Sequence, residues 1–164
     1  MRIYYPVLAR ELEEGNLAPR PAYCVAPSSS LRGEDLELAE DDARDLAALD
    51  SLALLRDEQG ALSRCIIAAD IEGISVAPYD GEVAQTQPCA PVESHIAAYF
   101  IDHPDASEKV RAVLDAQTQD EADEAVAQLW DESMEWYAPE EREDVIRILR
   151  LMLRVEPRPS FHVT

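Results

Sequence analysis

Short β-prone segments and helix-prone segments alternate along this sequence, and the alternation restricts the fold more than any other feature. Apolar residues at two-residue spacing are typical of strands, whereas apolar residues at three- and four-residue steps are typical of helices. The strand-like segments cover residues 3–7, 22–26, 64–69, 74–79, 83–87, 95–101 and 134–138. The helix-like segments cover residues 8–14, 34–58, 106–116 and 119–132, and a last one begins at Pro139. We therefore expect the α+β class, with a mixed or antiparallel sheet of about four to six strands and helices mainly on one face.

The length of 164 residues is ordinary for one globular domain. We expect a single domain over residues 1–156 and a flexible C-terminal tail over residues 157–164. The longest uncharged apolar runs, such as 96–101, are far too short to cross a bilayer, so no membrane partner is expected. The segment 1–7 lacks the apolar centre of a secretion signal, and the expected location is the cytoplasm.

Local signals mark the turns and the helix starts. Asp80 and Gly81 form a turn dipeptide, so we expect 74–79 and 83–87 to make a hairpin. Thr118 stands three residues before Glu121, which is the spacing of a capping box at the start of a helix.

The segment 34–58 is predicted to be a long helix with one apolar face. The residues that recur at helical spacing are Leu36, Ala39, Ala43, Leu46, Ala47 and Leu49. Asp41, Asp45 and neighbouring acids lie on the opposite face, which is typical of a solvated surface.

The charge balance excludes one class of ligand. The chain has 34 acidic and 14 basic residues, and its formal net charge is −20. Such a charge repels nucleic acid, whose non-specific binding depends on lysine and arginine, so no direct nucleic-acid binding is expected. Lys109 is the only lysine, which favours a GC-rich coding genome and an acidity that is compositional background. The alternative is an acidic face that imitates DNA or docks a basic partner.

The last helix has more apolar residues than a solvent-facing helix needs. Glutamates follow Pro139 and arginines stand near the far end, an order that complements the helix dipole. Either this helix packs deep against the sheet, or part of it forms an interface with a second copy or another protein. In the second case we expect Leu149 and Met152 to lie in the interface of a homodimer or a complex.

Sequence motifs for cofactor and metal binding are absent. The chain has five glycines and no glycine-rich phosphate loop, and no G-x-S-x-G elbow surrounds a serine. Cys24, Cys65 and Cys89 form no C-x-x-C pair and are expected to be reduced thiols, mostly buried. We therefore expect no metal and no cofactor.

Two groups of residues are candidates for a chemical site. His103, between Asp102 and Pro104 with Asp105 beyond, is the best candidate for acid–base chemistry, because two carboxylates would raise its pKa. The alternative is a histidine that caps the next helix. Trp136 and Tyr137 are candidates to line a ligand pocket, although paired aromatic residues more often anchor a core.

Four segments resemble a family of short actinobacterial proteins of unknown function. The family begins with an M-R-I-Y-x-P segment, has an A-A-D strand end and closes with a W-Y-A-P-x-E segment. These correspond to Met1–Pro6, Ala68–Asp70 and Trp136–Glu141, and a further similarity covers Ser94–Asp105. The resemblance implies an actinobacterial origin and carries over no activity.

These observations support two functional hypotheses of different classes. The first is a non-enzymatic cytosolic interaction or regulatory protein whose acidic surface or last helix engages a partner. The second is a small hydrolase or ligand-binding protein with a pocket near His103, Trp136 and Tyr137.

Overall fold

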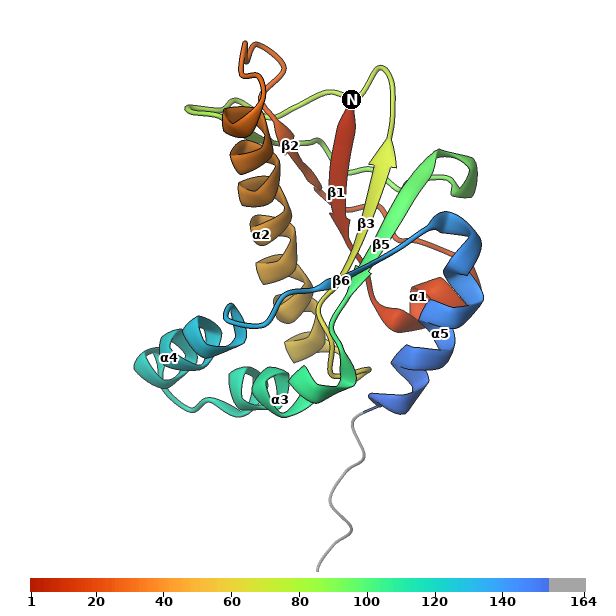
Figure 1. Ribbon diagram of the computed structural model, residues 1–164, viewed down its shortest axis with the longest axis vertical. Coiled ribbons are helices and arrows are strands. Elements are labelled where there is room, and N and C mark those ends of the chain that lie inside the picture. Colours follow the sequence, from red (N-terminus) through yellow and green to blue (C-terminus); the bar gives the residue numbers. More distant parts are fainter. Residues whose placement is uncertain (154–164) are drawn as a thin grey trace, which may run out of the picture.

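All neighbouring strands of the single sheet run antiparallel in the computed structural model, which describes residues 1–153. The strands are β1 (Arg2–Pro6), β2 (Tyr23–Val25), β3 (Cys65–Asp70), β4 (Val83–Gln85), β5 (Ile96–Ile101) and β6 (Glu135–Tyr137). Their order is β4-β2-β1-β3-β5-β6, so that β1 and β3 occupy the centre (Figure 1). The expectation of an α+β domain with an antiparallel sheet is confirmed. The predicted tail 157–164 and the last residues of the predicted domain lie outside the described residues.

Five α-helices connect and cover these strands. They are α1 (Ala9–Glu14), α2 (Glu34–Asp57), α3 (Ser107–Asp115), α4 (Gln119–Leu129) and α5 (Arg142–Leu151). Thr118 caps α4 as expected, because its hydroxyl accepts the amide of Glu121 at 3.1 Å. In Figure 1, α2 flanks the sheet along its length, α3 and α4 lie beyond the C-terminal half of α2, and α1 and α5 lie together on the other side.

Alternation along the strands divides the apolar residues between the two faces of the sheet. Tyr4, Ile66 and Ala68 face α2, whereas their neighbours Tyr5 and Ile67 face α1 and α5. Both sets are buried, so the sheet lies between two helical layers rather than facing water on one side. The continuous apolar run in β3, residues 65–69, follows from this double burial.

A row of alanines brings α2 close to the sheet. Ala39, Ala43 and Ala47 stand four residues apart and are at most 1% exposed. Four-residue steps keep side chains on one face of a helix, and a methyl group leaves little space between the helix backbone and the strands. The large side chains on the same face of the sheet, Tyr4 and Ile66, fill the space that the alanines leave.

The last helix, α5, packs into the core with Val145, Ile146 and Leu149. Leu149 is 2% and Met152 is 3% exposed, so these two side chains are in the core and are not offered to a partner in this fold. Leu151, at 77% exposed, is the apolar side chain of this helix that faces outward.

The predicted strand 74–79 does not form. Val76 makes one isolated bridge with Thr86, formed by the two backbone hydrogen bonds of Ser75 with Gln87 and of Ala77 with Gln85. The pairing ends after these bonds, and residues 77–79 belong to no strand. The result is a loose hairpin whose second arm contains β4.

Candidate functional site

Two hollows follow one another along the outer side of α2. The first has a volume of about 470 Å³ and lies between α2 and the turn that enters β4. It is lined by Asp42, Asp45, Leu46, Leu49, Asp80, Glu82 and Val83. The second has a volume of about 400 Å³ and lies between the C-terminal half of α2 and the pair α3 and α4. Its lining includes Leu49, Ala53, Arg56, Val113, Asp123 and Val126. Because Leu49 lines both, we treat the two hollows together as the α2 groove.

The floor of the α2 groove comes from a second stripe of α2, next to the buried alanines. Asp42, Leu46, Leu49, Ala53 and Arg56 recur at three- and four-residue steps and therefore share one face of the helix. Leu46 is 39% exposed and Leu49 is 42% exposed, and α2 rises about 21 Å from residue 42 to residue 56. Single exposed leucines are common on protein surfaces, whereas these two lie together in one hollow.

The first hollow is strongly acidic. Its lining includes four carboxylates and no lysine or arginine. The nearest arginine along α2, Arg44, bonds to Asp41 at 3.0 Å and lies over the ring of Phe100, so its charge is directed to the other side of the helix. Burial raises the pKa of Asp45; Arg44 opposes the rise, and the neighbouring charges of Asp41 and Asp42 add to it. A cation in this hollow would find carboxylates that no basic side chain in the lining neutralises.

The second hollow has walls from three helices. Arg56 extends from α2 to α3, where its Nη2 donates to the carbonyl oxygen of Val113 at 3.2 Å. The hairpin of α3 and α4 packs on the end of α2 through Leu52, Leu55 and Val110. This packing fixes the angle between the walls, so the apolar strip made by Ala53 and Val126 remains open.

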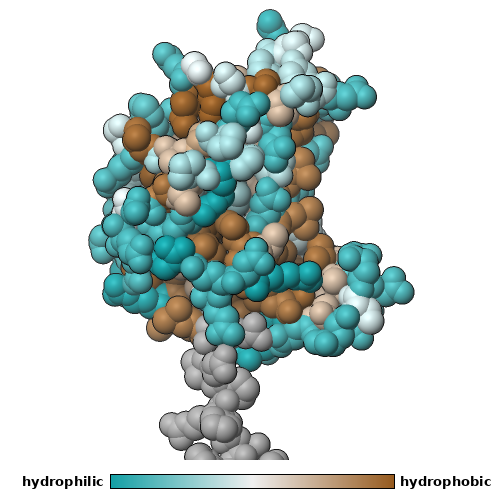
Figure 2. Space-filling view, turned by 180° about the vertical axis from the view of Figure 1, so that it is seen from behind, coloured by the Kyte–Doolittle hydropathy of each residue, from teal (hydrophilic) through white to brown (hydrophobic). Residues whose placement is uncertain are grey.

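The surface seen from behind mixes the two kinds of side chain. Figure 2 shows brown apolar patches separated by teal hydrophilic residues across this face.

The structure brings only one of the two candidate carboxylates to His103, because Nδ1 of His103 lies 3.3 Å from Oδ2 of Asp105 whereas Asp102 is turned to another partner. His103 is about half exposed, and its Nδ1 accepts the amide of Asp105 at 3.1 Å, which is the capping contact. Asp102 is fully buried, and its carboxylate faces Arg64, whose Nη2 lies 2.6 Å from Oδ1. The two carboxylates therefore do not flank the imidazole together.

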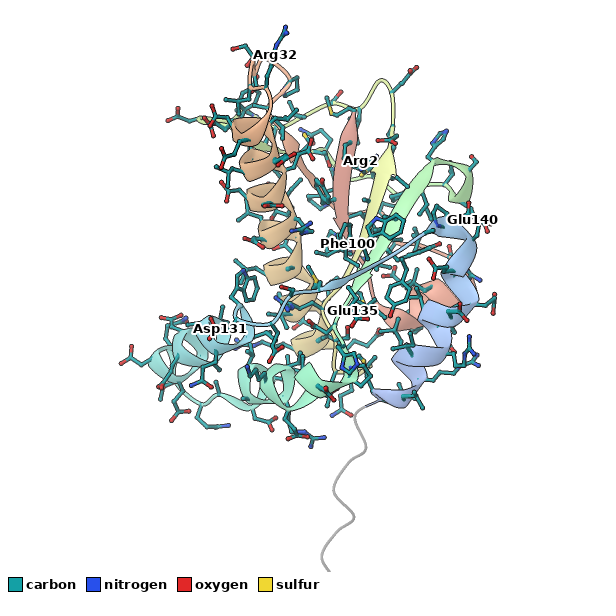
Figure 3. The ribbon with its side chains drawn as sticks, viewed as in Figure 1. Arg2, Arg32, Phe100, Asp131, Glu135 and Glu140 are labelled. Atoms are coloured by element: carbon teal, nitrogen blue, oxygen red, sulfur yellow. The ribbon has the colours of Figure 1, made fainter. Side chains whose placement is uncertain are left out.

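Trp136 and Tyr137 point to opposite faces, because they are successive residues of a strand. Trp136 is 58% exposed and pairs across the sheet with Phe100, on the α2 side. The hydroxyl of Tyr137 donates to Glu135 at 2.9 Å, and burial, with the nearby carboxylates, raises the pKa of Tyr137 to about 12. Figure 3 labels Phe100 on β5 and Glu135 on β6. His103, Trp136 and Tyr137 line neither hollow of the α2 groove.

The α2 groove was not predicted from the sequence. Leu46 and Leu49 fit the helical spacing of a core face, and the structure leaves them partly exposed. The signal was the width of the apolar arc, which runs from the alanine row into a second stripe and exceeds what one sheet face covers. The acids at Asp80 and Glu82 reach the groove only through the fold of the hairpin.

Fold and groove together define a single-domain α+β protein with an open antiparallel sheet and an acidic, leucine-floored surface on its longest helix. The chain belongs to the family of unknown function DUF6912, whose sequence profile matches residues 1–146. No curated protein and no solved structure matches it.

Two further properties of residues 1–153 bear on the site. No cluster of three or more histidine, cysteine or acidic side chains in this range could hold a metal ion. Likewise, no helix within it combines the length and the apolar character needed to cross a membrane.

Proposed function

We propose that this chain is a protein-binding module that receives a basic, amphipathic helix of a partner protein in the α2 groove. The observation that carries the proposal is the stripe of Leu46 and Leu49, exposed on the groove floor and bordered by four carboxylates. An amphipathic helix buries its apolar face in such a groove, with anchor residues at three- and four-residue steps.

The dimensions of the groove fit a helix of about four turns. Its floor extends about 21 Å along α2, and a partner helix of about 14 residues has the same length. The walls are the turn before β4 at one end and the α3–α4 hairpin at the other, and both border Leu49. A helix lying between them would place its apolar residues against Leu46, Leu49 and Ala53.

The charge of the groove favours a basic partner over a second copy of this chain. Two copies would each bring a net charge of −20, and their repulsion would oppose association. Lysine and arginine on the flanks of a partner helix would instead approach Asp42, Asp80 and Glu82, and opposite charge would accelerate the encounter.

The proposed location is the cytoplasm. Cys24, Cys65 and Cys89 are all free thiols, and two of them are buried. Reduced thiols without a disulfide partner support a reducing compartment.

Two synthetic peptides test the proposed function. One is an amphipathic helix with leucine on one face and lysine on its flanks, and the other has the same composition in scrambled order. We expect the full chain to bind the first peptide and not the second in fluorescence anisotropy, with affinity that falls as salt increases. Backbone amide shifts in NMR should change along residues 42–56 and 80–83.

Matched variants separate the groove from the general acidity. Leu49→Ser should weaken binding at least about tenfold through lost apolar contact. The double variant Asp42→Asn, Asp80→Asn should weaken it about threefold to tenfold, whereas Glu72→Gln with Glu140→Gln removes the same charge elsewhere and should leave affinity nearly unchanged. Equal affinity for both peptides, or equal losses in both double variants, would overturn the proposal.

A further inference from the structure

A small pocket opens on the face of the sheet opposite α2. It has a volume of about 70 Å³ and lies between α1, β5 and α5, and we name it the Tyr99 pocket after one of the side chains that line it. Leu17, Ile67, Pro91 and Ile96 form its apolar walls. Its volume is about twice what a water molecule occupies in the liquid, which suits a ligand of very few atoms.

The hydroxyl of Tyr99 is the first sign of a ligand. Tyr99 is 2% exposed and its hydroxyl makes no hydrogen bond within residues 1–153, yet the oxygen atom itself is not fully buried, which leaves it reachable from the pocket. Buried tyrosine hydroxyls normally have one, as Tyr5 on the same face does with Ala18 and Arg20. Burial raises the pKa of Tyr99, with Arg142 opposing and Glu93 adding to the rise, so the hydroxyl keeps its proton and can donate.

Arg142 supplies a second donor in the same pocket. Its Nη2 donates to the carbonyl oxygen of Leu12 and its Nη1 to Glu143 at 3.1 Å. A guanidinium has five N–H groups, so others remain for a ligand. Gly15 lines the pocket beside it, and a Cβ added there would lie 3.9 Å from Nη2. The absence of a side chain at Gly15 leaves the approach to the guanidinium open.

The two acids of the pocket do not compete equally for this guanidinium. Glu11 already accepts the amides of Leu8 and Ala18 and both terminal nitrogens of Arg20, so its oxygens are occupied. Glu93 stands in an exposed turn, where water screens its charge. The pocket therefore offers two donors from Tyr99 and Arg142 next to an apolar wall.

We propose that the Tyr99 pocket binds a small carboxylic acid. The carboxylate accepts hydrogen bonds from Arg142 and Tyr99, and the short aliphatic chain contacts Ile67 and Ile96. Arginine pairs with carboxylates through two parallel N–H donors, a geometry that a neutral amide cannot match in strength. This site is separate from the α2 groove and does not depend on the function proposed for it.

Titration of the full chain with sodium propionate tests this inference. We expect saturable NMR shifts at Tyr99, Ile96 and Arg142, with a dissociation constant in the millimolar range. Sodium chloride at equal ionic strength and propionamide, which has nearly the same shape without the charge, should produce no saturable change. Inorganic phosphate should bind more weakly than propionate, because its oxygens would meet the apolar wall.

Variants identify the groups that hold the acid. Tyr99→Phe removes one unpartnered hydroxyl, so it should leave the fold intact and weaken binding about fivefold. Arg142→Lys should weaken binding more, because an ammonium group cannot make the paired contact. Tyr23→Phe, on the opposite face, is the control and should bind normally. Shifts that remain linear with concentration, equal binding of propionamide or phosphate, or unchanged binding in Tyr99→Phe would overturn the proposal.

Discussion

The ion pair between Arg64 and Asp102 shows how much a single buried contact contributes. Arg64 is 3% exposed and Asp102 is fully buried. The carboxylate accepts the backbone amide of Arg64 as well as its Nε and Nη2, and the guanidinium also lies 4.9 Å from the ring centre of Trp130. Through Nη2, Arg64 donates to the carbonyl oxygen of Glu132 at 2.8 Å, which ties β3 to the segment before β6.

Removing one partner of this pair should be far more damaging than removing a partner on the surface. Asp102→Ala leaves a buried guanidinium without its counter-charge, and we expect the free energy of unfolding to fall by about 3–5 kcal/mol. Asp70 makes the same kind of paired contact with Arg2 on the surface, where Asp70→Ala should change stability by less than about 1 kcal/mol. Urea unfolding of both variants gives the comparison, and similar losses would contradict it.

Glu11 gives the protein a pH dependence with a defined sign. Burial alone would raise the pKa of Glu11, but hydrogen bonds from Arg20 and from the amides of Ala18 and Leu8 outweigh burial and lower it. A carboxyl whose pKa is lower in the folded state stabilises the fold above its unfolded pKa, and this stability is lost as the pH falls through the folded value.

The contribution of Glu11 should therefore disappear in acid. We expect Glu11→Gln to be clearly less stable than the wild type at neutral pH, and the difference to shrink as the pH falls below about 4.3, the usual pKa of glutamate. Chemical denaturation over a pH series measures it. A difference that stays constant with pH would show that the glutamate acts by shape rather than by charge.

The sequence does not reveal which polar side chains will be buried when their hydrogen-bond partners are far away along the chain. Asp102 was predicted as a flank of His103, yet its partner Arg64 stands just before β3, 38 residues earlier in the chain. Glu11 resembles an ordinary surface acid in a short helix, and only Arg20 and the loop amide of Ala18 reveal it as buried. By contrast, the caps made by His103 and Thr118 involve neighbours within three residues, so both partners can be read from the sequence. The second half of the expected capping box does not form, because Glu121 accepts the amide of Gln117 instead of that of Thr118.

At the scale of elements, α2 shows two stripes with opposite tolerance to substitution. The alanine row packs directly on the sheet and leaves no room for a larger side chain, whereas Ala53 on the adjacent stripe is exposed. We expect Ala47→Leu to lower the free energy of unfolding by about 1–3 kcal/mol through overpacking. Ala53→Leu should leave it almost unchanged. Thermal unfolding of the two variants decides the matter, and a tolerated leucine at 47 would mean that α2 does not pack closely on the sheet.

The acidic end of α2 links partner binding to protons. Because burial raises the pKa of Asp45, its carboxyl group keeps its proton to a higher pH than an exposed aspartate does. A basic partner favours the ionised form, so binding should release protons and strengthen as the pH rises through the raised pKa. Calorimetry of the helical peptide in buffers of different ionisation enthalpy measures the release, and Asp45→Asn should abolish it.

Periodicity predicts elements well where one face is buried and poorly where pairing is brief. The long helix, the short strand at 22–26 and the last helix all contain repeated apolar positions, and each appears in the structure. The segment 74–79 has a strand-like alternation as well, but its pairing stops after one bridge. The groove on α2 was missed because periodicity does not say which of two apolar stripes the sheet will cover.

At the scale of the whole molecule, excess negative charge should set the response to salt. The net charge is −20, so the acidic side chains repel one another in the compact folded chain. This repulsion is smaller in the expanded unfolded chain, where the charges are farther apart. We expect the unfolding temperature to rise as sodium chloride increases from low to physiological concentration, and sedimentation to show a monomer throughout. An unfolding temperature that does not change with salt would mean that local ion pairs already offset the repulsion between the acidic side chains.

The order of the strands could not be predicted from the sequence, although the class of the fold could. Alternating strand-like and helix-like segments indicate an α+β domain, but they do not say that β1 is placed between β2 and β3. That arrangement depends on contacts such as Tyr4 with Ala68, which join segments on either side of α2. Local propensity carries no information about such pairs, because they form only when the intervening chain has folded back.

The central position of β1 has a consequence for a chain that is still being synthesised. Its neighbour β2 follows soon after it, but β3, which supplies its other edge, emerges only after all of α2. During that interval, one row of amides and carbonyls on β1 is without its native partner, next to the apolar side chains that the finished core will cover. A nascent polypeptide paused before residue 65 would therefore expose to chaperones an aggregation-prone strand that is paired along one edge only.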